Sequence, residues 1–160
     1  MFKKFLITLL ILFTFTFPLY SAGTSDGSSK INNFKKASSL IKQAKKYEKK
    51  GKIKKAEKKF KKALEYLIIT NKNNPNQPDT LNYLGFASRK IGKYKEAEEY
   101  YLAGLKIKPN HNGINEYLGE LYISTNRIEK AKERLKVLEN CNCEEFKELK
   151  NSINKGSSKY

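Results

Sequence analysis

The stretch from Leu81 to Pro109 reads LNYLGFASRKIGKYKEAEEYYLAGLKIKP, and it decides the fold. Apolar residues recur at spacings of three and four, both before and after the turn-forming residue Gly92. This period is typical of amphipathic α-helices. The stretch therefore predicts two helices joined by a short turn, with the second helix ending before Pro109.

The same pattern recurs along the chain, so the stretch is one unit of an internal repeat. Leu84-Gly85 reappears 34 residues later as Leu118-Gly119, and Ala97 reappears as Ala131. An earlier copy is offset by 41 residues, with the extra residues in the polar loop Asn71–Gln77. The turn position is shared by Gly51, Gly92 and Asn126. The small residues predict places where helices approach closely, because they leave room for a neighbouring backbone.

The repeat predicts an all-α fold in which three helix pairs stack, because no pair buries its apolar stripe alone. A further helix after the third pair would cover its exposed face. We expect a signal peptide in residues 1–23, a flexible linker in 24–33, a repeat domain in 34–154 and a disordered tail in 155–160. Within the domain we expect repeats at 37–70, 78–111 and 112–143, and a capping helix at 144–154.

Residues 1–23 have the layout of a secretory signal peptide. Two lysines precede an apolar run from Phe5 to Tyr20, and small residues follow at Ala22 and Gly23. We expect cleavage near Ala22 or Gly23 and, for a bacterial protein, a periplasmic or secreted location. The alternative is an uncleaved inner-membrane anchor formed by residues 5–20. That run is short compared with the roughly 20 residues of a full membrane span.

The formal net charge is +17, from 33 basic and 16 acidic residues. Fifteen lysines lie between Lys30 and Lys62 against two glutamates, so most of the excess falls on the first helix pair. One reading is a solvated lysine-rich surface that reflects an AT-rich coding sequence. The other is an electrostatic patch for an anionic membrane or an acidic partner. Only three basic residues are arginine, which disfavours phosphate and nucleic-acid recognition.

No Gly-rich phosphate loop, nucleophile motif or paired-carboxylate motif occurs in the sequence. His111 is the only histidine, and we expect it to be solvent-exposed in the loop after Pro109. A metal site needs several ligands, and none lies near His111 in the sequence. We therefore expect no enzymatic activity, no cofactor, no metal and no small-molecule substrate.

The two cysteines, Cys141 and Cys143, are separated by one residue at the end of the third pair. In an oxidising compartment they favour a local disulfide that would pin the junction to the last helix. Such a small loop adds little stability through chain entropy. The alternatives are an intermolecular bridge and a redox-active pair.

The repeat resembles the tetratricopeptide repeat family, whose signature combines Leu-Gly with an aromatic residue, alanines and a closing proline. The middle pair fills the family positions with Leu81, Leu84-Gly85, Ser88, Ala97, Tyr101, Gly104 and Pro109. The third pair fills them with Asn115, Leu118-Gly119, Tyr122, Ala131, Leu135 and Leu138. The first pair fills them with Leu40, Gln43-Ala44, Tyr47, Ala56, Phe60 and Ala63. The ending with Cys141 and Cys143 is similar to small exported members of the family from alphaproteobacteria.

The resemblance implies an α-α superhelix whose concave face is built from the first helix of each pair. It implies a non-enzymatic scaffold or adaptor in the cell envelope that binds a peptide or protein segment in this groove. The implied groove residues are Lys45, Asn82, Phe86, Arg89, Glu116 and Glu120. Of these, we expect Asn82, Phe86 and Arg89 to be surface residues. The pattern of carboxylate-clamp members is not matched, because Ile41, Tyr83 and Gly113 occupy positions that would need polar or basic groups.

Overall fold

The computed structural model describes residues 26–158, with side chains described from Asn33 onward. This part of the chain is entirely helical and contains no strand, which confirms the predicted all-α class. The expected signal peptide lies outside the described residues. The helices are α1 (Asp26–Lys49), α2 (Ile53–Asn73), α3 (Pro78–Lys90), α4 (Tyr94–Ile107), α5 (Asn112–Ser124), α6 (Ile128–Leu138) and α7 (Glu144–Lys155).

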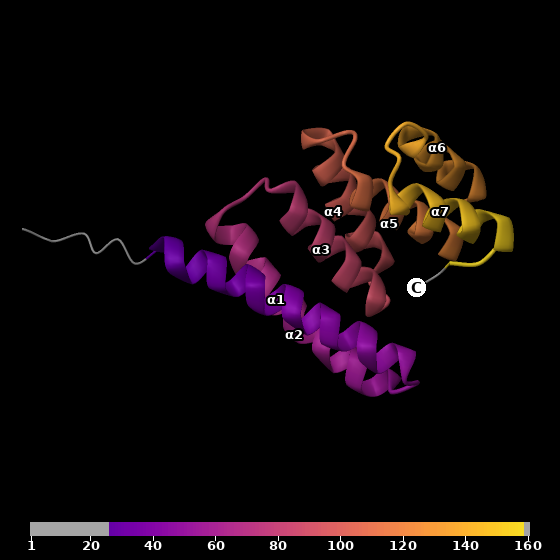
Figure 1. Cartoon of the computed structure of the whole chain (residues 1–160). Coiled ribbons are helices and arrows are strands. Elements are labelled where there is room, and N and C mark those ends of the chain that lie inside the picture. The colour runs from indigo at the N-terminus through magenta and orange to yellow at the C-terminus, as the bar shows by residue number, and fades with distance from the viewer. Residues whose placement is uncertain (1–25, 159–160) are drawn as a thin grey trace, which may run out of the picture.

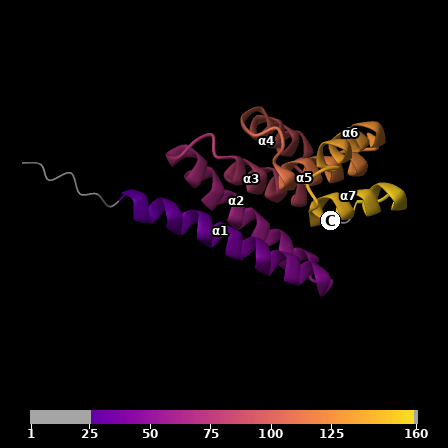
Figure 2. The same ribbon diagram turned by 45° about the horizontal axis from the view of Figure 1, so that its top comes forward.

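The helices form a superhelical stack of three pairs with a capping helix. α1 packs on α2, α3 on α4 and α5 on α6, and α7 covers α5 and α6 (Figure 1). The first helices are also in contact with one another, α1 with α3 and α3 with α5. A view turned by 45° shows the same order of pairs along the stack (Figure 2). Among the described residues, no helix is long and apolar enough to cross a membrane.

The turns inside the pairs share one backbone geometry. Gly51, Gly92 and Asn126 have φ values of 66°, 81° and 58°, in the left-handed region. In each turn the next residue donates its N–H to a carbonyl five residues back, at 2.9 Å, 2.9 Å and 2.7 Å. This is a Schellman motif, which satisfies the free carbonyl groups at a helix end. The shared turn position predicted from the repeat is thus confirmed.

Gly85 and Gly119, the two repeated glycines, mark close helix contacts. A Cβ atom on Gly85 would collide with the ring of Tyr101 on α4. A Cβ atom on Gly119 would lie 2.6 Å from Cδ2 of Leu149 on α7. Both positions therefore need glycine for the observed packing. In the third pair, however, it is the capping helix and not α6 that approaches the glycine.

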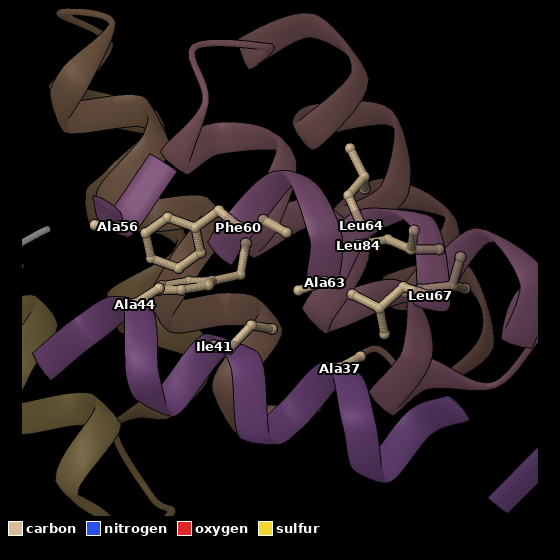
Figure 3. Packing of buried hydrophobic residues seen from close by; sticks show 12 residues of the cluster. Ala37, Ile41, Ala44, Ala56, Phe60, Ala63, Leu64, Leu67 and Leu84 are labelled. Carbon is tan, nitrogen blue, oxygen red and sulfur yellow. The ribbon is translucent and has the colours of Figure 1, made fainter. Parts of the chain in front are cut away.

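Two hydrophobic cores hold the stack together. The first joins α1, α2 and α3, and the second joins α4, α5, α6 and α7. Figure 3 shows the first core, in which Ala37, Ile41 and Ala44 of α1 face Phe60 and Leu67 of α2. Burial of a large side chain such as Phe60 or Leu67 contributes about 1.5–3 kcal/mol.

Two boundaries differ from the expected ones. α1 begins at Asp26 and so includes most of the linker expected at 24–33. Extending an existing helix costs little, and no proline interrupts this segment. α2 continues to Asn73, past the expected end of the first repeat at residue 70. It stops where Pro75 disfavours helical geometry at the residue before it.

Candidate partner-binding site

The six predicted groove residues all lie on the first helices of the pairs. Lys45 is on α1, three residues are on α3, and Glu116 and Glu120 are on α5. The structure brings Lys45 and Phe86 together, with Nζ of Lys45 4.5 Å from the centre of the Phe86 ring. The guanidinium carbon of Arg89 lies 5.8 Å from the centre of the same ring. Residues far apart in sequence thus share one side of the stack.

The expectation that Asn82, Phe86 and Arg89 form an outer surface is wrong. All three are buried, and Phe86 and Arg89 are only 1% and 4% exposed. The reason is that α3 is the central first helix and has neighbours on both sides. Phe86 packs edge-on against Phe60 of α2, with ring centres 5.8 Å apart, and against Tyr117 of α5 at 4.8 Å.

A surface that remains half-exposed runs beside these buried residues. It consists of Phe34, Tyr83 and Tyr117 together with Lys45, and we call it the aromatic strip. The rings of Phe34 and Tyr83 meet edge to face at 5.5 Å. Lys45 donates a hydrogen bond from Nζ to the hydroxyl of Tyr117 at 3.3 Å. The strip therefore joins all three first helices.

Neither tyrosine of the aromatic strip was predicted as a site residue. Tyr83 and Tyr117 are 34 residues apart, so they occupy the same position in consecutive repeats. That coincidence is a usable signal in the sequence. Tyr83 enters the prediction only as a mismatch to the carboxylate-clamp pattern.

A cluster of buried polar side chains lies at the Arg89 end of the aromatic strip. Glu120 is fully buried and accepts a hydrogen bond from the hydroxyl of Ser152 on α7 at 2.5 Å. Tyr101 lies nearby, and its pKa is raised, mainly by burial, while the charge of Arg89 opposes the shift. The negative charges of Glu116 and Glu120 add to this increase. The Tyr101 hydroxyl therefore stays protonated in the cluster.

The chain's own carboxy-terminal segment reaches this polar cluster. Gly156 ends α7 with a φ of 64°, and Ser157 donates its N–H to the carbonyl of Ser152 at 3.3 Å. Ser158 then donates a hydrogen bond to the carboxylate of Glu120 and accepts one from Arg89 at 3.2 Å. The structure thus differs from the disordered tail expected at 155–160, because the turn at Gly156 directs Ser158 back to α3 and α5.

Comparison with known proteins identifies one repeat of the chain. Residues 78–111 match the model of the tetratricopeptide repeat. Residues 78–111 therefore form a tetratricopeptide repeat. The matched segment comprises α3, α4 and the turn between them, which is the pair with the clearest pattern in the sequence.

The solved structures that are similar to this chain include the type III secretion translocator chaperone SycD of Yersinia enterocolitica. The two chains are 19% identical, and the match covers 74% of this chain and 85% of that one, with a TM-score of 0.47. No curated protein sequence matches the repeat protein.

His111 is a structural residue in this repeat protein and not the exposed loop residue that we expected. Its Nδ1 accepts a hydrogen bond from the N–H of Ile114 at 3.2 Å and so caps the start of α5. Its Nε2 lies 3.0 Å from the carboxylate of Asp79 at the start of α3. Since Nδ1 is an acceptor, Nε2 carries the proton and donates to Asp79. His111 therefore links the second and third repeats.

The structure joins Cys141 and Cys143 by a disulfide across the turn between α6 and α7, with Cα atoms 5.2 Å apart. Both residues are half-buried against the second core. Among the described residues, no group of three or more histidine, cysteine, aspartate or glutamate side chains is placed to hold a metal ion. The cysteine pair therefore lies at a packed junction, where a covalent link holds the start of α7 close to the end of α6.

Proposed function

We propose that this repeat protein is a non-enzymatic scaffold or adaptor of the cell envelope that binds an extended protein segment along the aromatic strip. The tetratricopeptide fold supports a role in protein–protein interaction. The envelope location rests on the signal-like sequence of residues 1–23.

The contact of Ser158 carries this proposal. Ser158, two residues after the turn at Gly156, already inserts its hydroxyl between Arg89 and Glu120, at the end of the strip. The two charged groups offer a donor and an acceptor in a buried setting, where hydrogen bonds to charged groups are strong. The same arrangement suits a partner segment that carries a hydroxyl or amide side chain.

The chemistry of the strip fits a peptide ligand. Tyr83 and Tyr117 each present a broad apolar ring with a polar hydroxyl at its edge, a combination enriched in protein interfaces. Lys45 adds a positive charge over the ring of Tyr117, 5.5 Å from its centre. We therefore infer a partner segment that combines apolar and acidic side chains, with a polar residue at the Arg89 end.

Site-specific photo-crosslinking in the native cells tests the proposal. A photoreactive phenylalanine analogue is placed at Tyr83 or at Tyr117, and the crosslinked products are identified by mass spectrometry. The control places the same analogue at Leu102, an exposed apolar residue on the second helix α4. We expect Tyr83 and Tyr117 to capture the same partner segment and Leu102 to capture none of it.

The opposite pattern would count against the groove. If Leu102 captured the partner and both tyrosines did not, binding would take place on the second helices. A segment whose crosslinked residues were all basic would contradict the role proposed for Lys45.

A further inference from the structure

The first helix pair extends beyond the rest of the stack. α1 and α2 have 24 and 21 residues, whereas α3 and α4 have 13 and 14, and the additional residues lie at the end of the pair opposite the turn at Gly51. The hairpin of α1 and α2 ends beside the last turn of α3, where Lys90 pairs with Glu48, and its apex lies at the lower edge of both views (Figures 1 and 2). Its end is the sequence Lys49–Lys55, KKGKIKK, which we call the basic tip. All seven residues of the basic tip are exposed.

The backbone of the basic tip is held in one shape. Gly51 has a φ of 66°, and its N–H is donated to the carbonyl of Glu48 at 2.8 Å. Lys52 donates its N–H to the carbonyl of Tyr47 at 2.9 Å. A Cβ atom on Gly51 would meet nothing within 4 Å, so no other part of the described chain covers the apex.

The side chains of the basic tip combine charge with one exposed apolar group. Five of its seven residues are lysines, and none of them forms an ion pair with a carboxylate of the described residues. Ile53 lies among these lysines and is 61% exposed. Ile53 is the most exposed large hydrophobic residue of the described chain, so the basic tip combines positive charge with an accessible apolar group.

We propose that the basic tip docks on the surface of an anionic lipid bilayer. The lysines would lie at the level of the lipid phosphates, and Ile53 would enter the boundary between headgroups and acyl chains. Each lysine near an anionic surface strengthens partitioning by about fivefold. This proposal does not depend on the partner groove, which lies on other surfaces of the stack.

Two features favour a bilayer over an acidic protein. The apex at Gly51 is not covered by any other described residue, so it can contact a flat and fluid surface. Lysine is a point charge without the paired geometry of arginine, so it suits phosphates that have no fixed arrangement. Ile53 would gain from an apolar layer, which a soluble polyanion lacks.

The absence of tryptophan from the sequence allows a direct test. Ile53→Trp places a single fluorophore at the basic tip of the full chain. Val137→Trp places one at another exposed apolar position, 43% exposed, on α6. Each variant is mixed with phosphatidylglycerol vesicles, with phosphatidylcholine vesicles, and with anionic vesicles that contain a brominated lipid as quencher. Residues 1–25 are the same in every variant, so any contribution that they make to vesicle binding is equal in all the variants compared.

We expect the emission of Ile53→Trp to shift to the blue on anionic vesicles only, and to be quenched by brominated lipid. The emission of Val137→Trp should change in neither way. In the Ile53→Trp background, replacing Lys50, Lys52 and Lys54 by Gln should weaken partitioning by about 100-fold. The matched replacement of the exposed lysines Lys130, Lys132 and Lys136 on α6 should weaken it by only a few fold.

Several outcomes would overturn the proposal. Equal quenching at positions 53 and 137 would show that the tip is not the docking element. No shift at low salt would show that the tip does not bind the bilayer. Binding to polyglutamate without any lipid-dependent quenching would assign the tip to an acidic protein instead.

Discussion

Gly119 is the residue at which the fit of the capping helix is most sensitive. A side chain there would meet Leu149, which is fully buried. We expect Gly119→Leu to lower the free energy of unfolding by about 3 kcal/mol, because the added atoms force α7 away from α5. The midpoint of chemical denaturation, followed by circular dichroism, measures the change. Ser124→Leu, at an exposed position of the same helix, serves as the control, and an unchanged midpoint for Gly119→Leu would refute the packing.

Glu98 gives the stability of the protein a specific pH dependence. Arg127 donates hydrogen bonds to its two oxygens at 2.9 Å and 2.8 Å, joining α4 to the turn before α6. The hydrogen bond from Arg127 lowers the pKa of Glu98 below its ordinary value of 4.5, although partial burial opposes the shift. The pair therefore stabilises the fold at pH values above the ordinary pKa of 4.5. This stabilisation is lost as the pH falls through the lowered pKa of the folded protein.

The test of this dependence is Glu98→Gln. We expect the variant to be less stable than the natural protein by about 1 kcal/mol at pH 7. The difference should disappear in acid, where Glu98 is protonated in both folded and unfolded chains. Urea denaturation at a series of pH values measures it. Glu129→Gln, in an exposed pair with Lys132, should show almost no difference at any pH, and an effect of Glu98→Gln that persists in acid would contradict the lowered pKa.

Single residues were predictable where they belong to the repeat and unpredictable where the stacking alone creates a contact. Gly85 and the turn glycines follow from their positions in the pattern. The partner of Gly119 does not, because Leu149 belongs to the capping helix outside the repeat. The pairing of His111 with Asp79 likewise exists only because the starts of α3 and α5 lie side by side.

At the scale of the elements, the junction between α6 and α7 is held by both packing and a covalent link. The disulfide between Cys141 and Cys143 closes a very small loop. In the chain-entropy model this loop is worth roughly 1.5 kcal/mol, less than the typical 2–4 kcal/mol of a disulfide. Replacing both cysteines by serine should therefore lower the melting temperature only slightly.

Mass spectrometry of the protein from its native compartment tests the bridge itself. Alkylation without prior reduction should add no mass at either cysteine. Two alkylated thiols in the non-reduced sample would rule out the bridge. A disulfide-linked dimer would instead assign the cysteines to the intermolecular alternative.

Helix existence was predictable from periodicity, but helix ends were not. The apolar stripe of α1 starts near Phe34, whereas the helix begins at Asp26. Periodicity reports only the part of a helix that is packed against another element. The predicted exposure of the groove residues on α3 was also wrong, because neighbouring helices enclose α3 on both sides. A residue pattern does not show how closely neighbouring pairs approach.

At the scale of the whole molecule, the two hydrophobic cores predict that the ends of the stack unfold separately. The first core consists of residues from α1, α2 and α3, and the second core of residues from α4, α5, α6 and α7. Stability in stacked repeats is approximately a sum of local terms and nearest-neighbour terms. Gly119→Leu should therefore increase amide hydrogen exchange in α5, α6 and α7 and leave α2 protected.

Hydrogen exchange followed by mass spectrometry resolves the two halves. The natural protein in the same buffer is the reference, and Ser124→Leu is again the control. An equal increase of exchange in α2 and in α7 would show that the chain unfolds as a single cooperative unit.

The return of Ser158 to α3 has a practical consequence for anyone who labels this protein. An affinity tag or fluorescent reporter fused directly after Tyr160 would begin within a few residues of the Arg89 contact and would compete with it. The connection at Asn74–Gln77 is exposed and lies away from that contact. It is the better position for an epitope, because insertions in a surface loop cost little conformational entropy.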